Sequence, residues 1–203
     1  MQRLNTPTFF DQALPARGVN TLTRDALLVL FGSLLLALSA QTKVPLWPVP
    51  ASLQTLVLMV MAATFGWRLA GLTVIAYWLE GIAGFPVFAG ANFPGYFFGA
   101  SPTAGFLWGF LPAALFVGAA AQWGLARNPI MLAGVMLIAH LILYIPGLTW
   151  GSTFVGKVPW MAEGELLAKF FHPFIIGDIL KILIAVVLVP LAYKAVEAFR
   201  KDL

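Results

Sequence analysis

Residues 173–193 read PFIIGDILKILIAVVLVPLAY, an apolar run that carries one carboxylate, Asp178, and one ammonium group, Lys181. A membrane-spanning helix needs roughly 20 predominantly apolar residues to cross a hydrocarbon core about 30 Å thick. The run has this length, and the charged residues Lys194, Arg200 and Lys201 follow it. We therefore expect residues 173–193 to form a transmembrane helix.

The composition of the whole chain is that of an integral membrane protein. Of its 203 residues, 61% are hydrophobic and 10% are charged, with a mean hydropathy of +0.91, whereas soluble domains carry about 25% charged residues. The chain has no cysteine, which excludes disulfides and cysteine metal sites. The net charge is +4, but the basic residues form no cluster, so we expect no nucleic-acid partner.

Proline, glycine and charged residues divide the remaining sequence into five further apolar segments. With the last run they predict an all-α protein of six transmembrane helices: 26–42, 52–65, 68–83, 103–125, 129–144 and 173–193. Pro146 and Gly147 are expected to end the fifth helix. The polar interval 151–171 has room for a short surface helix.

The basic residues predict the orientation, because Lys and Arg are enriched in cytoplasmic segments. With the N-terminus inside, eight basic residues fall on the inner side: Arg3, Arg17, Arg24, Arg68, Arg127, Lys194, Arg200 and Lys201. Three fall outside: Lys43, Lys157 and Lys169. We expect one membrane domain over 1–203, with a cytoplasmic segment 1–22, a bundle 25–195 and a cytoplasmic tail 196–203. Long outer links favour a pocket that opens outward.

Asp178 and Lys181 are three residues apart and so share one face, within two turns of the outer end of their helix. An ionisable side chain near mid-bilayer costs about 2.5–3.5 kcal/mol on insertion scales, so such residues are usually functional. The pair either neutralises itself as a structural ion pair or binds a ligand. In the second case Lys181 would bind an anion and Asp178 would accept N–H groups.

Other polar residues are expected at the same depth. Gln54, Tyr77 and Glu80 lie at outer helix ends, and Asn92 lies in the following link. Each alone is explained equally well by a helix-end hydrogen bond or an interfacial position, but their shared depth favours a ligand site. Phe88 is one of several aromatic residues in the outer links that could wall a pocket or anchor the chain at the membrane interface.

The first predicted helix contains Ser33 and Ala37, a pair of small residues that allows close helix packing, within the bundle or with a partner. His140 and His172 have no acidic or histidine partner at ligand spacing, so we expect no metal site. No arrangement of catalytic residues stands out, so we expect no enzymatic activity.

Four segments occur in a distinctive order: PVPASLQT at 48–55, YWLEGIAGFPVFAG at 77–90, SPTAGF at 101–106 and PFIIGDILK at 173–181. Together they resemble the BioY family, the substrate-binding S components of energy-coupling-factor (ECF) biotin transporters. The resemblance spans about residues 25–195. Where the family usually has Gly-Pro-Thr-Gly-Gly-Tyr, this chain ends the motif in Phe106 and so lacks a tyrosine hydroxyl there.

The resemblance implies a six-helix S-component fold, high-affinity biotin binding in an outward-facing site, and a place in the plasma membrane of a prokaryote. Biotin would be the transported substrate, with no cofactor. A transmembrane T component, docked at Ser33 and Ala37, and two cytoplasmic ATPases are the implied partners. Biotin has an anionic valerate tail, a ureido ring and an apolar thiophane ring; Lys181 would meet the tail, Asp178 and Asn92 the ureido group, and outer aromatic residues the thiophane.

Two other functions remain open at this point. The chain could be an S component for another vitamin, such as thiamine. It could also be a membrane-embedded enzyme acting on a small ligand, with Asp178 or Glu80 as a general base, although no second catalytic group stands at a recognisable spacing.

Overall fold

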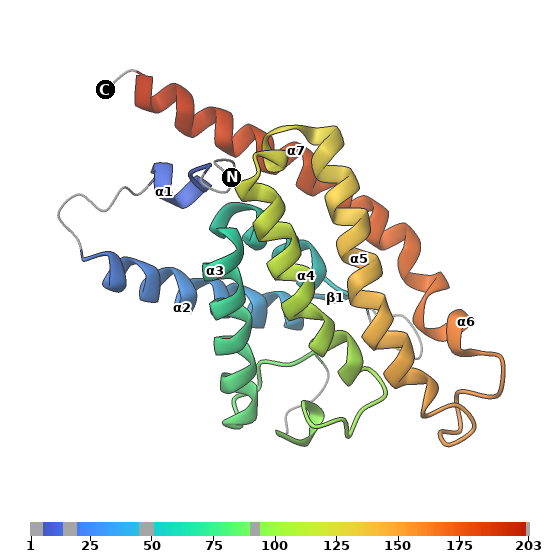
Figure 1. Cartoon of the computed structure of the whole chain (residues 1–203). Helices are drawn as coiled ribbons and strands as arrows, with labels where there is room; N and C mark the ends of the chain where they lie inside the picture. Colours follow the sequence, from blue (N-terminus) through green and yellow to red (C-terminus); the bar gives the residue numbers. More distant parts are fainter. Residues whose placement is uncertain (1–5, 14–19, 45–50, 90–93, 202–203) are drawn as a thin grey trace.

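A computed structural model describes residues 6–13, 20–44, 51–89 and 94–201 of the chain (Figure 1). The long helices are α2 (Thr21–Gln41), α3 (Gln54–Ile82), α4 (Ala104–Gln122), α5 (Pro129–Ser152) and α7 (His172–Lys201). The short elements are α1 (Phe9–Ala13), α6 (Leu166–Phe170), the 3-10 helices η1 (Pro94–Tyr96) and η2 (Leu125–Arg127), and the antiparallel pair β1 (Lys43–Val44) and β2 (Ala51–Ser52).

The prediction of a six-helix membrane bundle is confirmed. Within the described residues, five helices are long and apolar enough to cross a membrane. One of them, α3, is broken at Gly66, whose backbone has φ 76° and ψ 169°, and is therefore two spans in sequence. Figure 1 shows the chain reversing direction near this break, so the two halves of α3 are successive spans. The predicted helices 52–65 and 68–83 correspond to these halves.

Close approach of backbones holds α3, α4 and α5 together at the centre of the bundle. A methyl group on Gly105 would lie 2.2 Å from the carbonyl oxygen of Pro146, and one on Gly109 would lie 2.8 Å from that of Leu143. Both glycines are on α4 and four residues apart, the spacing that lets membrane helices pack closely. Because lipid supplies no hydrophobic force between helices, such packing is a main source of bundle stability.

The fifth helix is longer than predicted, and the expectation that Pro146 and Gly147 end it is wrong. α5 continues to Ser152 with Pro146 in its interior. A proline in a membrane helix is tolerated where neighbouring elements compensate for its missing hydrogen bond. Here Gly105 lets α4 approach the Pro146 carbonyl, and a methyl group on Gly147 would lie 2.5 Å from the Phe106 ring. The helix thus continues past Pro146 where it packs closely against α4.

Three other boundaries differ from the sequence prediction. α2 begins at Thr21, where the Asn20 side chain accepts a hydrogen bond of 3.0 Å from the Leu22 amide. The segment expected to precede the bundle contains α1, and α7 continues to Lys201 through most of the expected tail. The predicted surface helix in 151–171 is present as α6.

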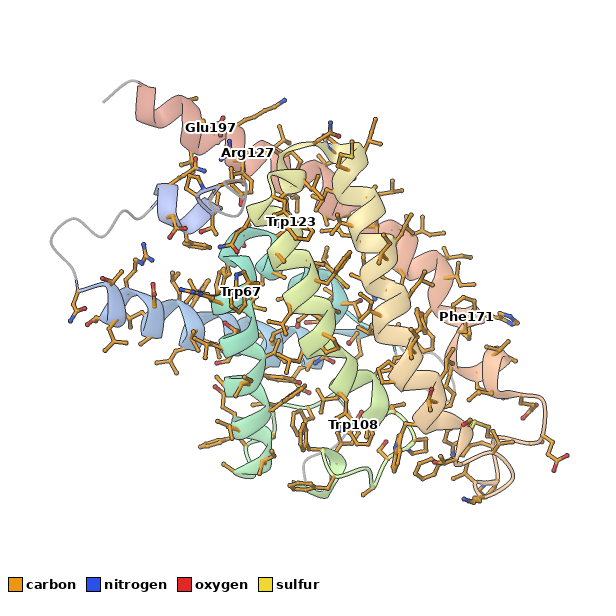
Figure 2. The ribbon with its side chains drawn as sticks, in the orientation of Figure 1. Trp67, Trp108, Trp123, Arg127, Phe171 and Glu197 are labelled. Carbon is orange, nitrogen blue, oxygen red and sulfur yellow. The ribbon has the colours of Figure 1, made fainter. Side chains whose placement is uncertain are left out.

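α1 and the end of α7 lie at the same end of the bundle (Figure 1). The Phe9 amide donates a 3.0 Å hydrogen bond to the Tyr193 hydroxyl, which donates to the carbonyl of Ala63 at 3.0 Å. Arg127 forms a 3.0 Å ion pair with Glu197 in the same region (Figure 2). The links that follow α3 and α5 lie at the opposite end (Figure 1).

Replacement of Gly118 by alanine tests the close packing at the centre. The new methyl group would lie 2.4 Å from the Trp67 backbone nitrogen, and backbone cannot move aside as a flexible side chain can, so we expect a loss of about 1–3 kcal/mol of stability. Thermal unfolding in detergent would measure it. Gly134→Ala on α5 is the matched control, because nothing lies within 4 Å of the added methyl group. Equal melting temperatures for both variants would contradict the packing described here.

Candidate ligand-binding site

A cavity of about 300 Å³ lies among α3, α4, α5 and α7 and the links that join them. Its polar lining comes from Ser52, Gln54, Thr55, Tyr77, Tyr96, Ser101, Thr103, Tyr144, Asp178 and Lys181. Its apolar lining comes from Ala51, Phe88, Ala89, Pro102, Phe106, Leu107, Phe110, Leu143, Trp160 and Phe174. Small-molecule sites are commonly apolar cavities of 300–1,000 Å³ with a few polar groups that fix orientation.

The depth of the cavity results from the short first half of α3. The first half of α3, from Gln54 to the break at Gly66, is about 18 Å long at 1.5 Å per residue, which falls short of the membrane core of about 30 Å. The helix therefore begins inside the bundle, and its first residues, Gln54 and Thr55, line the cavity. Irregular backbone is tolerated at this depth where protein surrounds it or where it lines a cavity.

Asp178 and Lys181 form an ion pair in the wall of this cavity. The Lys181 ammonium donates to Asp178 Oδ1 at 3.1 Å and to Thr55 Oγ1 at 2.9 Å. The Tyr144 hydroxyl donates to Asp178 Oδ2 at 2.7 Å, and Asp178 is only 9% exposed. An ammonium group has three hydrogens, so Lys181 keeps one for a ligand. The carboxylate has about four acceptor positions, so Asp178 also keeps capacity.

A hydrogen-bonded chain fixes another part of the cavity wall. Gln54 Nε2 donates to the Tyr77 hydroxyl at 2.8 Å, and that hydroxyl donates to the carbonyl of Val87 at 2.9 Å. The Tyr77 ring meets Phe88 edge to face at 5.4 Å. Phe88 lies so close to Gly81 that a methyl group there would be 2.0 Å from its ring. These contacts hold the link after α3 against the cavity.

A third group of polar side chains consists of neighbouring hydroxyls. Thr103 Oγ1 lies 2.6 Å from the Tyr96 hydroxyl and 3.0 Å from Ser101 Oγ. Trp150 Nε1 donates to the Ser101 carbonyl at 3.0 Å, which fixes this link against α5. Burial raises the pKa of the Tyr96 hydroxyl, so it stays protonated and remains a hydrogen-bond donor. The three hydroxyls have three hydrogens, of which two are used in the hydrogen bonds among them, so this uncharged patch keeps one donor for a ligand.

The structure brings most of the predicted site residues together. Gln54, Tyr77, Phe88, Asp178 and Lys181 all line the one cavity. Asn92 lies outside the described residues.

Glu80, Ser33 and Ala37 are placed elsewhere. Glu80 does not line the cavity; its Oε1 accepts a hydrogen bond of 2.6 Å from Ser33 Oγ, between α2 and α3. Ser33 is only 1% exposed, and Ala37 packs against the core. The Ser33 and Ala37 pair therefore packs within the bundle in this structure, one of the two roles that the sequence left open.

Several polar groups at the site were not predicted from the sequence. Thr55 and Tyr144 contact the ion pair directly, and His140 Nε2 lies 3.8 Å from Asp178 Oδ1. His140 and Tyr144 are four residues apart and so share a face of α5, which is the signal that could have indicated them. In the described part of the chain, no group of three His, Cys, Asp or Glu residues is placed to hold a metal ion.

The division of roles expected for Asp178 and Lys181 does not suit their geometry. An anionic tail at Lys181 would also lie beside the Asp178 carboxylate, because the two charged groups are 3.1 Å apart. Like charges at such a distance repel strongly inside a protein. A neutral ligand group with adjacent donors and acceptors suits the pair better, since it can use the free lysine hydrogen and an open carboxylate position together.

Loss of the Tyr144 hydroxyl tests the support of Asp178. Tyr144→Phe removes one hydrogen bond to a buried carboxylate, and hydrogen bonds to charged groups contribute about 1.5–3 kcal/mol, so we expect a lower melting temperature in detergent. In an Asp178→Asn background the same change should cost less, because the acceptor is no longer charged. A double-mutant cycle measures this coupling, and equal costs in both backgrounds would refute it.

Comparisons with known proteins support the resemblance seen in the motifs. Residues 9–198 match the model of the BioY family. A "Biotin transporter BioY" of Rhodobacter capsulatus is 38% identical over 168 residues, which cover 78% of this chain and 86% of that protein. One of Thermotoga maritima is 31% identical and covers 82% of this chain and 93% of that protein.

Among solved structures, the fold is similar to a crystal structure of "the S-component for biotin from an ECF-type ABC transporter". The TM-score is 0.65 at 20% identity, over 92% of this chain and 95% of that one. The family match over most of the chain and the two relatives above 30% identity agree with this shared fold. This chain therefore belongs to the BioY family.

Proposed function

We propose that this chain binds biotin and takes it up across the membrane as the S component of an ECF transporter. The observation that carries the proposal is a buried ion pair, Asp178 with Lys181, in the wall of a largely apolar cavity. Membership of the BioY family, and relatives named as biotin transporters, make biotin the ligand of choice. Biotin is then the transported substrate and not a cofactor.

The ureido ring of biotin suits the ion pair. Its carbonyl can accept the free hydrogen of Lys181, and an adjacent N–H can donate to Asp178, so a neutral group meets a pair that is neutral as a whole. The valerate carboxylate then lies toward the uncharged hydroxyl patch of Tyr96, Ser101 and Thr103, which keeps one hydroxyl hydrogen for it. Such convergence of a few polar groups in an apolar cavity fixes the orientation of a ligand.

The apolar parts of biotin suit the remaining walls. Phe88, Phe106 and Phe110 line the cavity. Aromatic rings offer large apolar contact areas, which the thiophane ring and the methylene groups of the tail can cover. We also propose a contact from Asn92, which is four residues after Phe88 in the sequence.

The orientation in the membrane follows from charge. We propose one membrane domain with both termini cytoplasmic, so that α1 and the end of α7 face inward and the cavity opens outward. Trp123 and Trp108 lie toward opposite ends of the bundle (Figure 2), as expected for aromatic residues at two membrane interfaces. The family and these apolar helices make the chain a multi-pass protein of a prokaryotic plasma membrane.

Energy for uptake against a gradient would come from partners. We propose a transmembrane T component and two cytoplasmic ATPases, because the structural neighbour belongs to an ECF-type ABC transporter. Docking through Ser33 and Ala37 would require α2 to shift on α3, since Ser33 is bonded to Glu80 and buried.

A melting screen of the purified chain would separate biotin from other vitamins. A ligand that binds only the folded state stabilises it by about 4 kcal/mol at a thousandfold excess over its Kd. We expect a clear rise in melting temperature with biotin and none with thiamine. A rise with thiamine alone would favour the other vitamin, and recovery of chemically altered biotin after incubation would favour an enzyme.

Replacement of Lys181 tests the proposed pose of the ligand. Lys181→Ala leaves Asp178 without its cation, and truncating a buried charge pair costs about 2–5 kcal/mol, or from about 30-fold to several thousand-fold in Kd. The same factor should be lost for biotin and for biotin amide, because the tail lies away from Lys181. Equilibrium binding to the detergent-solubilised chain measures both.

Lys157→Ala is the matched control for this measurement, because Lys157 is exposed in the link after α5 and does not line the cavity. We expect it to bind biotin like the unaltered chain. If Lys181→Ala weakens binding of biotin but leaves binding of biotin amide unchanged, the lysine meets the tail and the pose is wrong.

A further inference from the structure

His140 lies in the interior of the bundle, behind Asp178. The side chain is only 6% exposed and comes from α5, one turn before Tyr144. Its Nδ1 lies 2.8 Å from the carbonyl oxygen of Met136. Its Nε2 lies 3.8 Å from Asp178 Oδ1, within ion-pair range but too far for a hydrogen bond, and is buried with no hydrogen-bond partner among the described residues. Buried polar groups of this kind are rare and call for an explanation.

The two neighbours of the imidazole define its protonation. A carbonyl oxygen can only accept, so Nδ1 must carry a hydrogen to bond Met136. Neutral imidazole has a single N–H, which leaves a lone pair on Nε2 facing the carboxylate of Asp178. In the other neutral tautomer, with the hydrogen on Nε2, the lone pair of Nδ1 would face the carbonyl oxygen of Met136, and the two would repel each other. Only the imidazolium form, with a hydrogen on each nitrogen, suits both neighbours.

Few charged groups face His140. α7 contributes Asp178 and Lys181, and α5 itself contributes Tyr144. α4 and the first half of α3 have no Asp, Glu, Lys, Arg, His or Tyr. The other elements packed against α5 are η2 and α6, whose cations are paired elsewhere: Arg127 with Glu197, and Lys169 with Glu165. Asp178 is the acidic side chain within 4.0 Å of His140 in the described part of the chain.

We propose that His140 is a positioning residue of the binding site, which takes a proton from solvent and in that form holds Asp178 in place for the ligand. Tyr144 fixes Oδ2 of the carboxylate, and protonated His140 attracts Oδ1 from the side away from the cavity. The ureido group then meets a carboxylate of defined orientation. This inference rests on the proposed function, because biotin is the ligand whose binding reports it.

The proposed role makes binding depend on a proton. Only with a hydrogen on Nε2 can His140 attract the carboxylate of Asp178 and hold it for the ureido group. We therefore expect the affinity for biotin to fall as pH rises.

Biotin binding to the purified chain between pH 6 and pH 9 tests this inference. Carboxylates and lysines keep their ordinary charge over most of this range, whereas an unperturbed imidazole titrates within it. If binding depends on one bound proton, Kd should rise by up to about tenfold per pH unit in the steepest part of the curve. A Kd that stays constant over the whole range would overturn the inference and leave the proposed function intact.

Two substitutions separate protonation from packing. His140→Gln keeps an uncharged N–H donor without a titrating group, so its Kd should be nearly independent of pH. His140→Phe keeps a ring but has no donor, so it should bind biotin weakly at every pH. His172→Gln, at the exposed start of α7, is the matched control and should retain the pH dependence of the unaltered chain.

The outcomes are distinguishable. A pH dependence that survives in His140→Gln would overturn the role of His140, since another group must then titrate. Loss of the pH dependence in His172→Gln would overturn it as well. If the unaltered chain binds no biotin at any pH, the proposed function itself fails, and the inference fails with it.

Discussion

A carboxylate and an ammonium group inside a membrane bundle must pair with each other, because lipid supplies neither a hydrogen-bond partner nor an opposite charge. Asp178 and Lys181 lie 3.1 Å apart, and Tyr144 and Thr55 complete their contacts from two other helices. Removal of either charge would leave the other buried without compensation, which is costly. The pair therefore fixes how α3, α5 and α7 meet, and it leaves one lysine hydrogen and part of the carboxylate available to a ligand.

The rest of the fold makes space around this pair without weakening the bundle. The break at Gly66 shortens the first half of α3, so that Thr55 lies at the depth of Lys181. Gly105 and Gly109 bring α4 against α5 on one side of the cavity. Tight packing where glycines meet backbone, and an opening where a helix begins late, together give a preformed site. A preformed site saves the ordering cost of binding.

Apolar runs divided by proline, glycine and charged residues predicted the six spans, and the spacing of Asp178 and Lys181 predicted their shared face. The end of α5 could not be predicted, since packing by Gly105 against Pro146 overrides the helix-breaking tendency of proline. The position of Glu80 also depended on tertiary contact, because a residue at the right depth can face another helix. The spacing of His140 and Tyr144 shows that they share a face of α5, but only the tertiary structure shows that this face meets Asp178.

A structure of this chain with biotin bound would test the central claim most directly. The account predicts that the ureido oxygen lies within hydrogen-bond distance of Lys181 Nζ and a ureido nitrogen within that distance of Asp178, with the valerate carboxylate near Thr103. A carboxylate bonded to Lys181, or biotin bound outside this cavity, would contradict it.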